Sequence, residues 1–471
     1  MLLGMLNRNK ALLSLNWQDT LSVLLAVSFH FLSTVSLGGW SLRIGSSDLV
    51  LPVLCVMFFF EWFHLGRPAL TWRLPYLYIW LLVLTVWLLV SLVVGYAHIG
   101  GWDRWALVNK MVGWFILLTY FLVGGWIVCF RRSVGPGVFL RAYLVAGWGI
   151  SAYCVVMYAL YWHGVIQDVD YLRVQGFSDN PNAFGCIVAV MLALQLPYMA
   201  NGMLFSPWVH RVGFAVAALA LVFSGSRSAF LGLACAAPVL LVTRQVNLRE
   251  TFYGFGVGVA IVFVLFYLPF ETQDISSMLA GDSQKEVAAI GKEVAATKKE
   301  FYVFRGNQTQ DGGVRSRLQV SQDAIRLWRQ SPMIGAGLGR FYWEERQVGH
   351  LLVIHTTLLW LLTETGIIGV TLFVAFFLVC AGAIARPWRW GDHDPFQMGV
   401  LAVLLVVAGA SVGTEMLYQR HVWFLLGCAL AFRTASERTS EGCDITSERS
   451  AIMRINYFSR VQYGAREQAR C

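Results

Sequence analysis

The sequence predicts an all-α protein that crosses a membrane many times and carries one long polar loop on the outer side. Hydrophobic residues make up 57% of the 471 residues and charged residues only 13%, with a mean hydropathy of +0.60. Because a water-soluble domain carries roughly 25% charged residues, lipid must be the solvent for most of this chain. In addition, apolar runs of about 17–25 residues, the length that crosses a ~30 Å hydrocarbon core, recur along the sequence.

About twelve of these runs are predicted to be transmembrane helices, nine before the polar loop and three after it. The run 351–385 is too long for one upright helix, so we expect a short helix at the membrane surface followed by a span. No small-residue cleavage site follows the first run, which favours a retained helix over a signal peptide. The expected runs are 20–37, 48–64, 74–97, 109–130, 138–162, 183–200, 210–225, 227–243, 251–270, 351–385, 396–413 and 417–433.

The apolar runs divide the chain into four parts. Residues 1–270 are predicted to hold transmembrane helices one to nine, and residues 351–433 helices ten to twelve. Between them, residues 271–350 form a large loop domain, and residues 434–471 form a basic tail. Most Lys and Arg residues outside the loop lie at one set of membrane ends, which marks the cytoplasmic side. We therefore expect a multi-pass protein of a bacterial inner membrane, with both termini cytoplasmic and the loop periplasmic.

Charge, cysteine content and motifs exclude several classes of protein. The net charge of +9 includes no basic cluster interleaved with aromatic residues on a soluble face, so nucleic-acid binding is not expected. None of the nine cysteines lies in the loop domain, so we expect no disulfide framework and no C-x-x-C metal site. Walker and H-E-x-x-H motifs are absent too, and we expect neither a cofactor nor a metal ion. Glu61 and Glu364, near ends of apolar runs, are interpreted as structural.

The loop domain is predicted to contain two helices. Lys-Glu-Val-Ala-Ala at Lys285 repeats at Lys292, a pattern typical of a solvated helix lying on the protein or the membrane. A second helix is predicted over residues 314–330, followed by the glycine-rich turn Ser331-Pro-Met-Ile-Gly-Ala-Gly-Leu-Gly339. At 100° per residue, the inward face of this helix is expected to carry Leu318, Ser321, Ile325 and Trp328.

Two arginines of this second helix differ in direction. Arg317 falls on the inward side, between Ala324 and Trp328, whereas Arg315 falls on the opposite side. Because an arginine aimed at a protein interior needs an anionic partner, Arg317 is a candidate anion-binding residue.

Two further candidates lie where apolar runs begin. Arg227 sits in a tight turn between two runs, where a charge is costly unless it is paired or faces water. An interfacial arginine that reaches lipid headgroups would give the same pattern. His355 begins a helical stripe that continues through Gly366 and Gly369, so we expect it to face a packed seam. Histidine is the usual proton acceptor in catalysis, although a lone histidine is more often structural.

The outer loop 163–182 carries weaker candidates. Arg173, close in sequence to Asn180-Pro-Asn182, is a candidate substrate contact. Asp168-Val-Asp170, with Asp179, could hold a divalent metal ion. An isolated Asp-x-Asp is a weak signal, however, and acidic residues are common in loops.

Together these motifs resemble the O-antigen ligase family, within the O-antigen ligase/polymerase superfamily. The family's R-x-x-x-L corresponds to Arg227-Ser-Ala-Phe-Leu231. Its H-[NSQ]-x9-G-x-x-G corresponds to His355-Thr356, nine residues, and then Gly366-Ile-Ile-Gly369, with threonine replacing the usual second residue. Its loop arginine, before an aromatic helix and a Pro-x-x-Gly turn, corresponds best to Arg317 and next to Arg315. The resemblance covers most of the chain and implies a GT-C-like glycosyltransferase fold.

The resemblance also implies an activity. Members transfer a glycan from undecaprenyl pyrophosphate to a sugar hydroxyl of the lipid A–core oligosaccharide at the periplasmic face. In this sequence His355 would be the base, and Arg227, Arg317 or Arg315, and Arg173 would bind the pyrophosphate. The reaction would need no metal and would invert the anomeric carbon. Membrane lipids are the remaining expected partners.

Alternative activities share most of these residues. An O-antigen polymerase or a protein O-oligosaccharyltransferase of the same superfamily would differ in the acceptor, which no residue identifies. A lipid or polysaccharide transporter is the alternative from another class. Against it, the sequence has no repeated half and no paired broken helices in matching positions.

Overall fold

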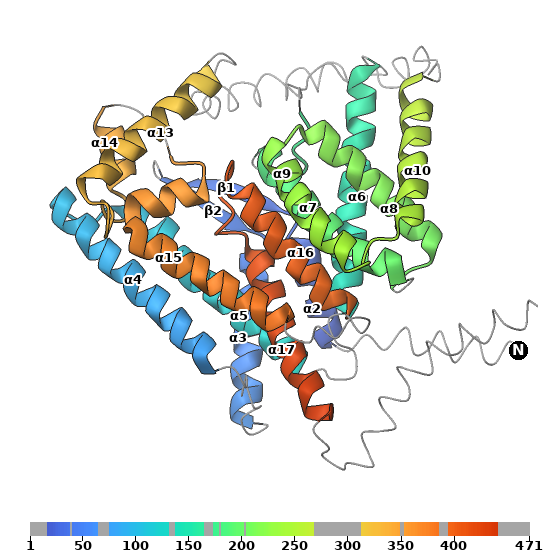
Figure 1. Ribbon diagram of the computed structural model, residues 1–471, viewed down its shortest axis with the longest axis horizontal. Coiled ribbons are helices and arrows are strands. Elements are labelled where there is room, and N and C mark those ends of the chain that lie inside the picture. Colours follow the sequence, from blue (N-terminus) through green and yellow to red (C-terminus); the bar gives the residue numbers. More distant parts are fainter. Residues whose placement is uncertain are drawn as a thin grey trace, which may run out of the picture.

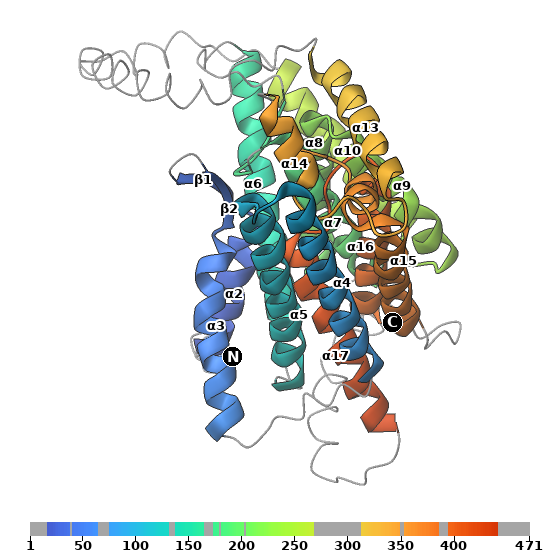
Figure 2. The same cartoon turned by 90° about the vertical axis from the view of Figure 1, so that its left-hand side faces the viewer.

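Long helices and a short β-hairpin make up the part of the chain that the structure describes (Figures 1 and 2). The structure is a computed structural model. It describes residues 17–37, 40–64, 75–130, 137–163, 173–178, 180–201, 204–267, 312–348, 353–385 and 394–440.

Seven helices in these ranges are long and apolar enough to cross a membrane. The prediction of a multi-pass helical protein is therefore confirmed, while the total of twelve spans and the GT-C-like arrangement stay predictions. The seven are α4 (Pro75–Ile99), α5 (Gly113–Phe130) with the π-helix η1 (Ala106–Val112) before it, α6 (Gly137–Trp162), α7 (Pro181–Asn201), α8 (Pro207–Ser224), α10 (Leu248–Tyr267) and α15 (Thr357–Ala385). Shorter apolar helices are α2 (Trp17–Ser28), α3 (Ser47–His64), α9 (Arg227–Val242), α16 (Pro395–Ala410) and the apolar part of α17 (Arg420–Ser440).

The predicted first helix, 20–37, is wrong in its second half. The helix α2 ends at Ser28, and strand β1 (Leu32–Leu37) then pairs antiparallel with β2 (Trp40–Gly45). The Thr34-Val35 pair in β1 has the branched side chains that favour strands. A short apolar run does not by itself distinguish a strand from a helix, which is why run length misled the prediction.

Neighbours far apart in the sequence form the helix bundle. The helix α5 packs against α17, and α16 packs against α7 and α9. The α5–α17 contact is close because Gly124 has no side chain: a Cβ there would lie 2.2 Å from the carbonyl oxygen of Phe424. In Figure 1, α6 to α10 lie together on the right, and α4 and α15 lie on the left below α13 (Gly312–Gln330) and α14 (Arg340–Gln347).

The helix α15 is broken at Gly366, which confirms that the run 351–385 is not one continuous helix. Gly366 has φ 70° and ψ −175°, a backbone conformation that only glycine adopts readily. In a membrane, freed backbone groups must find partners inside the protein. Here they do: the carbonyls of Thr363 and Glu364 accept from the N–H groups of Ala336 and Gly337, at 2.8 and 3.1 Å.

The glycine-rich turn after α13 therefore completes the hydrogen bonding of the broken helix. Beyond the break, the N–H groups of Ile367 and Ile368 donate to the carbonyls of Pro332 and Met333 at 3.0 and 3.2 Å. On its other side the turn meets α4, because the N–H of Leu338 donates to the Ser91 carbonyl at 2.9 Å. The predicted end of the second loop helix at Gln330 is confirmed, and the loop domain is anchored on two membrane helices.

The inward face of α13 differs from the prediction. Val320, Ala324 and Leu327 are at most 4% exposed, whereas Leu318 and Ile325 are 60% and 36% exposed. The helix is thus turned by roughly 100° from the predicted orientation. The reason is the small side chain of Ala324, which lets α13 approach α15 closely enough for Thr363 Oγ1 to donate to the Ala324 carbonyl at 3.4 Å. Bulky apolar residues had been expected to mark the buried side.

Several predictions lie outside the described residues. These are the Lys285–Lys292 repeat, the Asp168-Val-Asp170 motif with Asp179, and the tail from residue 441. The side chain of Glu61 also lies outside them. Helical structure continues into the first part of the predicted tail, because α17 ends at Ser440.

Candidate functional site

The turn between α8 and α9 presents Arg227 at the first position of α9. Gly225 caps α8 in the left-handed region at φ 59°, and Ser226 then adopts extended backbone, so the chain reverses within two residues. Ser224 and Ser226 are completely buried. The side chain of Arg227 is exposed, and none of the described carboxylates forms an ion pair with it. Its guanidinium can therefore bind an external anion.

Arg173 stabilises this turn through two hydrogen bonds. Its Nε donates to the Ser224 carbonyl at 2.7 Å, and its Nη2 donates to Asn182 Oδ1 at 2.9 Å. Arg173 and Asn182, which lie close in sequence, are therefore joined by a direct hydrogen bond, while the substrate contact predicted for Arg173 stays a prediction. Two of the Arg173 nitrogens already donate hydrogen bonds to protein oxygens, so Arg173 fixes the turn that bears Arg227. It also brings a second positive charge beside Arg227.

His355 lies before α15 and not within it. The helix begins at Thr357, two residues later, and the imidazole is exposed. The prediction that His355 faces a packed seam is thus wrong. The seam is real but starts further along, because Trp87 of α4 donates from Nε1 to the Thr365 carbonyl at 3.1 Å and packs at Gly369. Exposure makes the imidazole accessible to a substrate.

A single loop, residues 411–416 between α16 and α17, connects the segments that carry Arg227 and His355. On one side, a Cβ at Gly413 would lie 3.1 Å from Cβ of Ser228, the neighbour of Arg227. On the other, Thr357 Oγ1 donates to the Thr414 carbonyl at 3.2 Å and accepts from the Met416 N–H at 2.7 Å. Two residues predicted from separate parts of the sequence therefore flank the same loop.

The two loop-domain arginines are placed by backbone only. Arg315 and Arg317 fall in the first turns of α13, and their side chains lie outside the described part of the structure. Which of them faces the Arg227–His355 region is a prediction that stays open.

Comparison with known proteins finds one family model that matches part of the chain. Residues 212–374 match the family model described as O-antigen ligase. This segment, about a third of the chain, is therefore similar to an O-antigen ligase domain and is named the O-antigen ligase domain for that similarity. No curated protein matches the sequence.

The O-antigen ligase domain contains most of the predicted site. Arg227, Arg315, Arg317 and His355 all lie inside residues 212–374. Arg173 and the 411–416 loop lie outside the matched segment, although they contact residues at both of its ends. The site therefore combines the O-antigen ligase domain with flanking helices.

Sequence reasoning missed a group of charged residues, two of them buried, that lies partly inside and partly outside the O-antigen ligase domain. Lys110 of η1 is 4% exposed and forms an ion pair with Glu415, in the 411–416 loop. Glu364, interpreted from sequence as structural and near an end, is 1% exposed at the break in α15. Charged residues inside apolar helices are rare and are functional candidates by default, so the isolated lysine in the run 109–130 was the signal that could have revealed this group.

Proposed function

We propose that this protein is an O-antigen ligase of the bacterial inner membrane. It transfers a glycan from undecaprenyl pyrophosphate to a sugar hydroxyl of the lipid A–core oligosaccharide, at the periplasmic face. The observation that carries the proposal is the position of Arg227 and His355 on either side of the 411–416 loop, within or next to a domain that matches O-antigen ligase. An anion-binding residue and a proton acceptor at one place are what this reaction requires.

The arginines bind the donor. Pyrophosphate leaves readily when its growing negative charge is neutralised, and guanidinium groups bind phosphate oxygens through two parallel hydrogen bonds. The exposed Arg227 supplies this contact, with the charge of Arg173 behind it. Arg317, or else Arg315, completes the binding from the loop domain. Because the arginines supply the positive charge, no metal ion is needed in this scheme.

His355 is the base. It accepts the proton of the acceptor hydroxyl as that oxygen attacks the anomeric carbon of the donor. The new glycosidic bond forms while the bond between the anomeric carbon and the phosphate oxygen breaks, and undecaprenyl pyrophosphate leaves with the electron pair. A single displacement inverts the configuration of the anomeric carbon. The exposed position of His355 supports this role, because the base must meet a bulky acceptor.

A deletion strain tests the proposal by the glycans it accumulates. Loss of a ligase leaves lipid A–core without polymer on a lipopolysaccharide gel, while lipid-linked polymer accumulates. Core carrying a single repeat unit would instead indicate a polymerase. Intact lipopolysaccharide would indicate a protein O-oligosaccharyltransferase, and glycan uptake without transfer would indicate a transporter.

Complementation with His355→Ala tests the base in the same strain. We expect normal amounts of inserted protein and no restoration of capped lipopolysaccharide. Full capping by this variant would remove His355 from the mechanism without affecting the assignment of the reaction.

A further inference from the structure

Lys110, in the π-helix η1 just before α5, is surrounded by aromatic rings and a carboxyl group. Its Nζ lies 4.1 Å from the ring centroid of Trp360 and 4.8 Å from those of Trp105 and Tyr418. The same ammonium forms the ion pair with Glu415. Cation–π contacts and a carboxylate thus replace the water that a lysine normally has.

A second carboxyl group, that of Glu364, is linked to Lys110 through Trp360. Trp360 Nε1 donates to Glu364 at 2.8 Å, and the Nζ of Lys110 lies over the ring of the same tryptophan. Glu364 also accepts from the N–H of Gly339. Gly339 ends the glycine-rich turn that follows α13. The Glu364 carboxyl therefore holds this turn at the break in α15.

Lys110 consequently joins two segments that reach the candidate site from different directions. Glu415 belongs to the 411–416 loop, which touches Ser228 beside Arg227 and Thr357 near His355. Glu364 fixes the turn after α13, the helix that carries the loop-domain arginines, because its backbone carbonyl also accepts from the Gly337 N–H at 3.1 Å. Residues 305 positions apart in the sequence meet in this one ion pair.

Stability alone does not explain these charges. Moving an ion pair out of water carries a desolvation penalty that can exceed the attraction between the two charges, and replacing such a pair with apolar side chains of similar volume is often neutral or stabilising. Two buried ionisable groups, Lys110 and Glu364, together with the partly exposed Glu415, therefore point to a function that apolar packing cannot supply. Lys110 and Glu364 are at most 4% exposed, too little to meet a glycan.

We propose that Lys110 is a positioning residue for the glycan transfer. Through Glu415 and Glu364 it fixes the 411–416 loop and the turn after α13. The arginines then meet the pyrophosphate, and His355 the acceptor hydroxyl, in one geometry. This inference rests on the proposed function. It places part of the site's support on an ion pair outside the O-antigen ligase domain.

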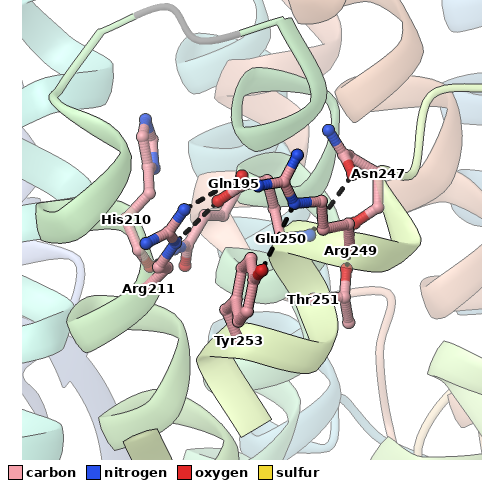
Figure 3. Close-up of polar contacts among 8 residues, drawn as sticks. All are labelled: Gln195, His210, Arg211, Asn247, Arg249, Glu250, Thr251 and Tyr253. Carbon is pink, nitrogen blue, oxygen red and sulfur yellow. Dashed lines mark hydrogen bonds and ion pairs between the residues drawn. The ribbon is translucent and has the colours of Figure 1, made fainter. Parts of the chain in front are cut away.

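The test compares this ion pair with another one in the same protein. Figure 3 shows the control: Arg211 of α8 donates from Nε and Nη2 to the Glu250 carboxylate of α10, at 2.7 and 3.0 Å, and stacks on Tyr253. That pair joins two helices without any contact to the 411–416 loop among the described residues. Removing it should affect helix packing alone.

The full-length protein is purified in lipid nanodiscs, and transfer from an undecaprenyl-pyrophosphate-linked glycan is measured for four variants. We expect Lys110→Met and Glu415→Gln to lower kcat about 100-fold, as misplacement of a reacting group by about 1 Å does. The KM for the acceptor should stay close to the wild-type value. The charge swap Lys110→Glu with Glu415→Lys should recover a large part of kcat, and Glu250→Gln should keep wild-type kcat.

Undecaprenyl pyrophosphate binding, measured by native mass spectrometry, and the thermal unfolding midpoint complete the comparison. We expect weaker binding by Lys110→Met with an unfolding midpoint no lower than that of Glu250→Gln. Wild-type kcat in Lys110→Met would overturn the inference. So would a loss that follows the unfolding midpoint equally at both ion pairs; if Lys110→Met does not fold, the milder Glu415→Gln decides. A wild-type protein that neither binds nor transfers would instead contradict the proposed function.

Discussion

At the scale of single residues, the role of each arginine in the candidate site depends on whether its guanidinium group is exposed or already bound to protein oxygens. Arg227 is exposed at the first position of α9, whereas Arg173 beside it is already bound to Ser224 and Asn182. The first can bind a substrate and the second can hold the turn. Sequence reasoning identified both residues, because charges between apolar runs stand out, but it could not separate these two roles. That distinction depends on hydrogen bonds to partners that are far away in the sequence.

Substitutions of Arg227 should lower the transfer rate in steps, according to how much of the guanidinium group's charge and hydrogen-bonding geometry they remove. Lysine keeps the charge but not the planar pair of donors, so Arg227→Lys should retain partial transfer, whereas Arg227→Gln should be about 100-fold slower. Steady-state transfer rates of the purified variants measure this. Because the side chain is exposed, neither change should lower the thermal unfolding midpoint. A glutamine variant with wild-type turnover would exclude Arg227 from donor binding.

Asp103 makes stability depend on pH. Burial raises the pKa of its carboxyl more than the Ala106 N–H and the charge of Arg346 lower it. Since the folded protein keeps this proton to a higher pH than an unfolded aspartate, with a pKa of about 3.9, the stability that the group contributes is present below that value. It is lost as pH rises through the raised pKa.

Asp103→Asn should therefore be more stable than the wild type at neutral pH and equal to it in acid. The asparagine oxygen can still accept from the Ala106 N–H, which the carboxylate does now at 2.9 Å. Thermal unfolding midpoints between pH 4 and pH 8 measure the difference, with Asp323→Asn, in the solvent-accessible pair with Arg326, as the control. A constant difference at every pH would contradict this explanation.

At the scale of elements, the broken helix α15 organises the region around His355. Its freed carbonyl groups accept from the turn after α13, so the loop domain and the membrane helices share one hydrogen-bond network. Long apolar runs predicted the helices well, since a single property identifies them. The hairpin 32–45, the rotation of α13 and the exposed His355 were missed because each depends on contacts between segments. In α13, the small Ala324 and not the bulky Leu318 marks the contact.

Gly366→Ala should destabilise the protein strongly. A Cβ at this position would lie 2.3 Å from the Met333 carbonyl oxygen and 2.5 Å from the Gly335 nitrogen, both backbone atoms. The φ of 70° adds a strain of about 1–3 kcal/mol. Gly382→Ala on the same helix is the matched control, because nothing lies within 4 Å of its added Cβ.

Thermal unfolding in detergent compares the two glycine variants. The Gly366 variant should unfold at a clearly lower temperature, and Gly382→Ala should be neutral or stabilising by up to about 1 kcal/mol, since alanine favours helix more than glycine does. Equal unfolding midpoints would mean that the break in α15 accommodates an added methyl group without loss of stability.

At the scale of the whole molecule, the proposed site and its proposed support come from three separate stretches of the chain. The O-antigen ligase domain, 212–374, supplies Arg227 and His355. Lys110 comes from before it and Glu415 from after it. Motif reasoning reached the first group because family motifs are local in sequence. The pairing of Lys110 with Glu415 could not be predicted from the sequence around either residue, because the two meet only when α5 packs against α17 in the folded bundle.

The side of the membrane on which this site lies is the last prediction. The excess of Lys and Arg at one set of helix ends predicts a cytoplasmic tail and a periplasmic loop domain. In a variant without native cysteines, Val348→Cys at the 68% exposed end of α14 should react with a membrane-impermeant maleimide in intact spheroplasts. Cys443, restored alone, should react only after permeabilisation. Because His355 follows Val348 by seven residues and precedes α15, the opposite labelling would place the base in the cytoplasm and contradict a periplasmic transfer.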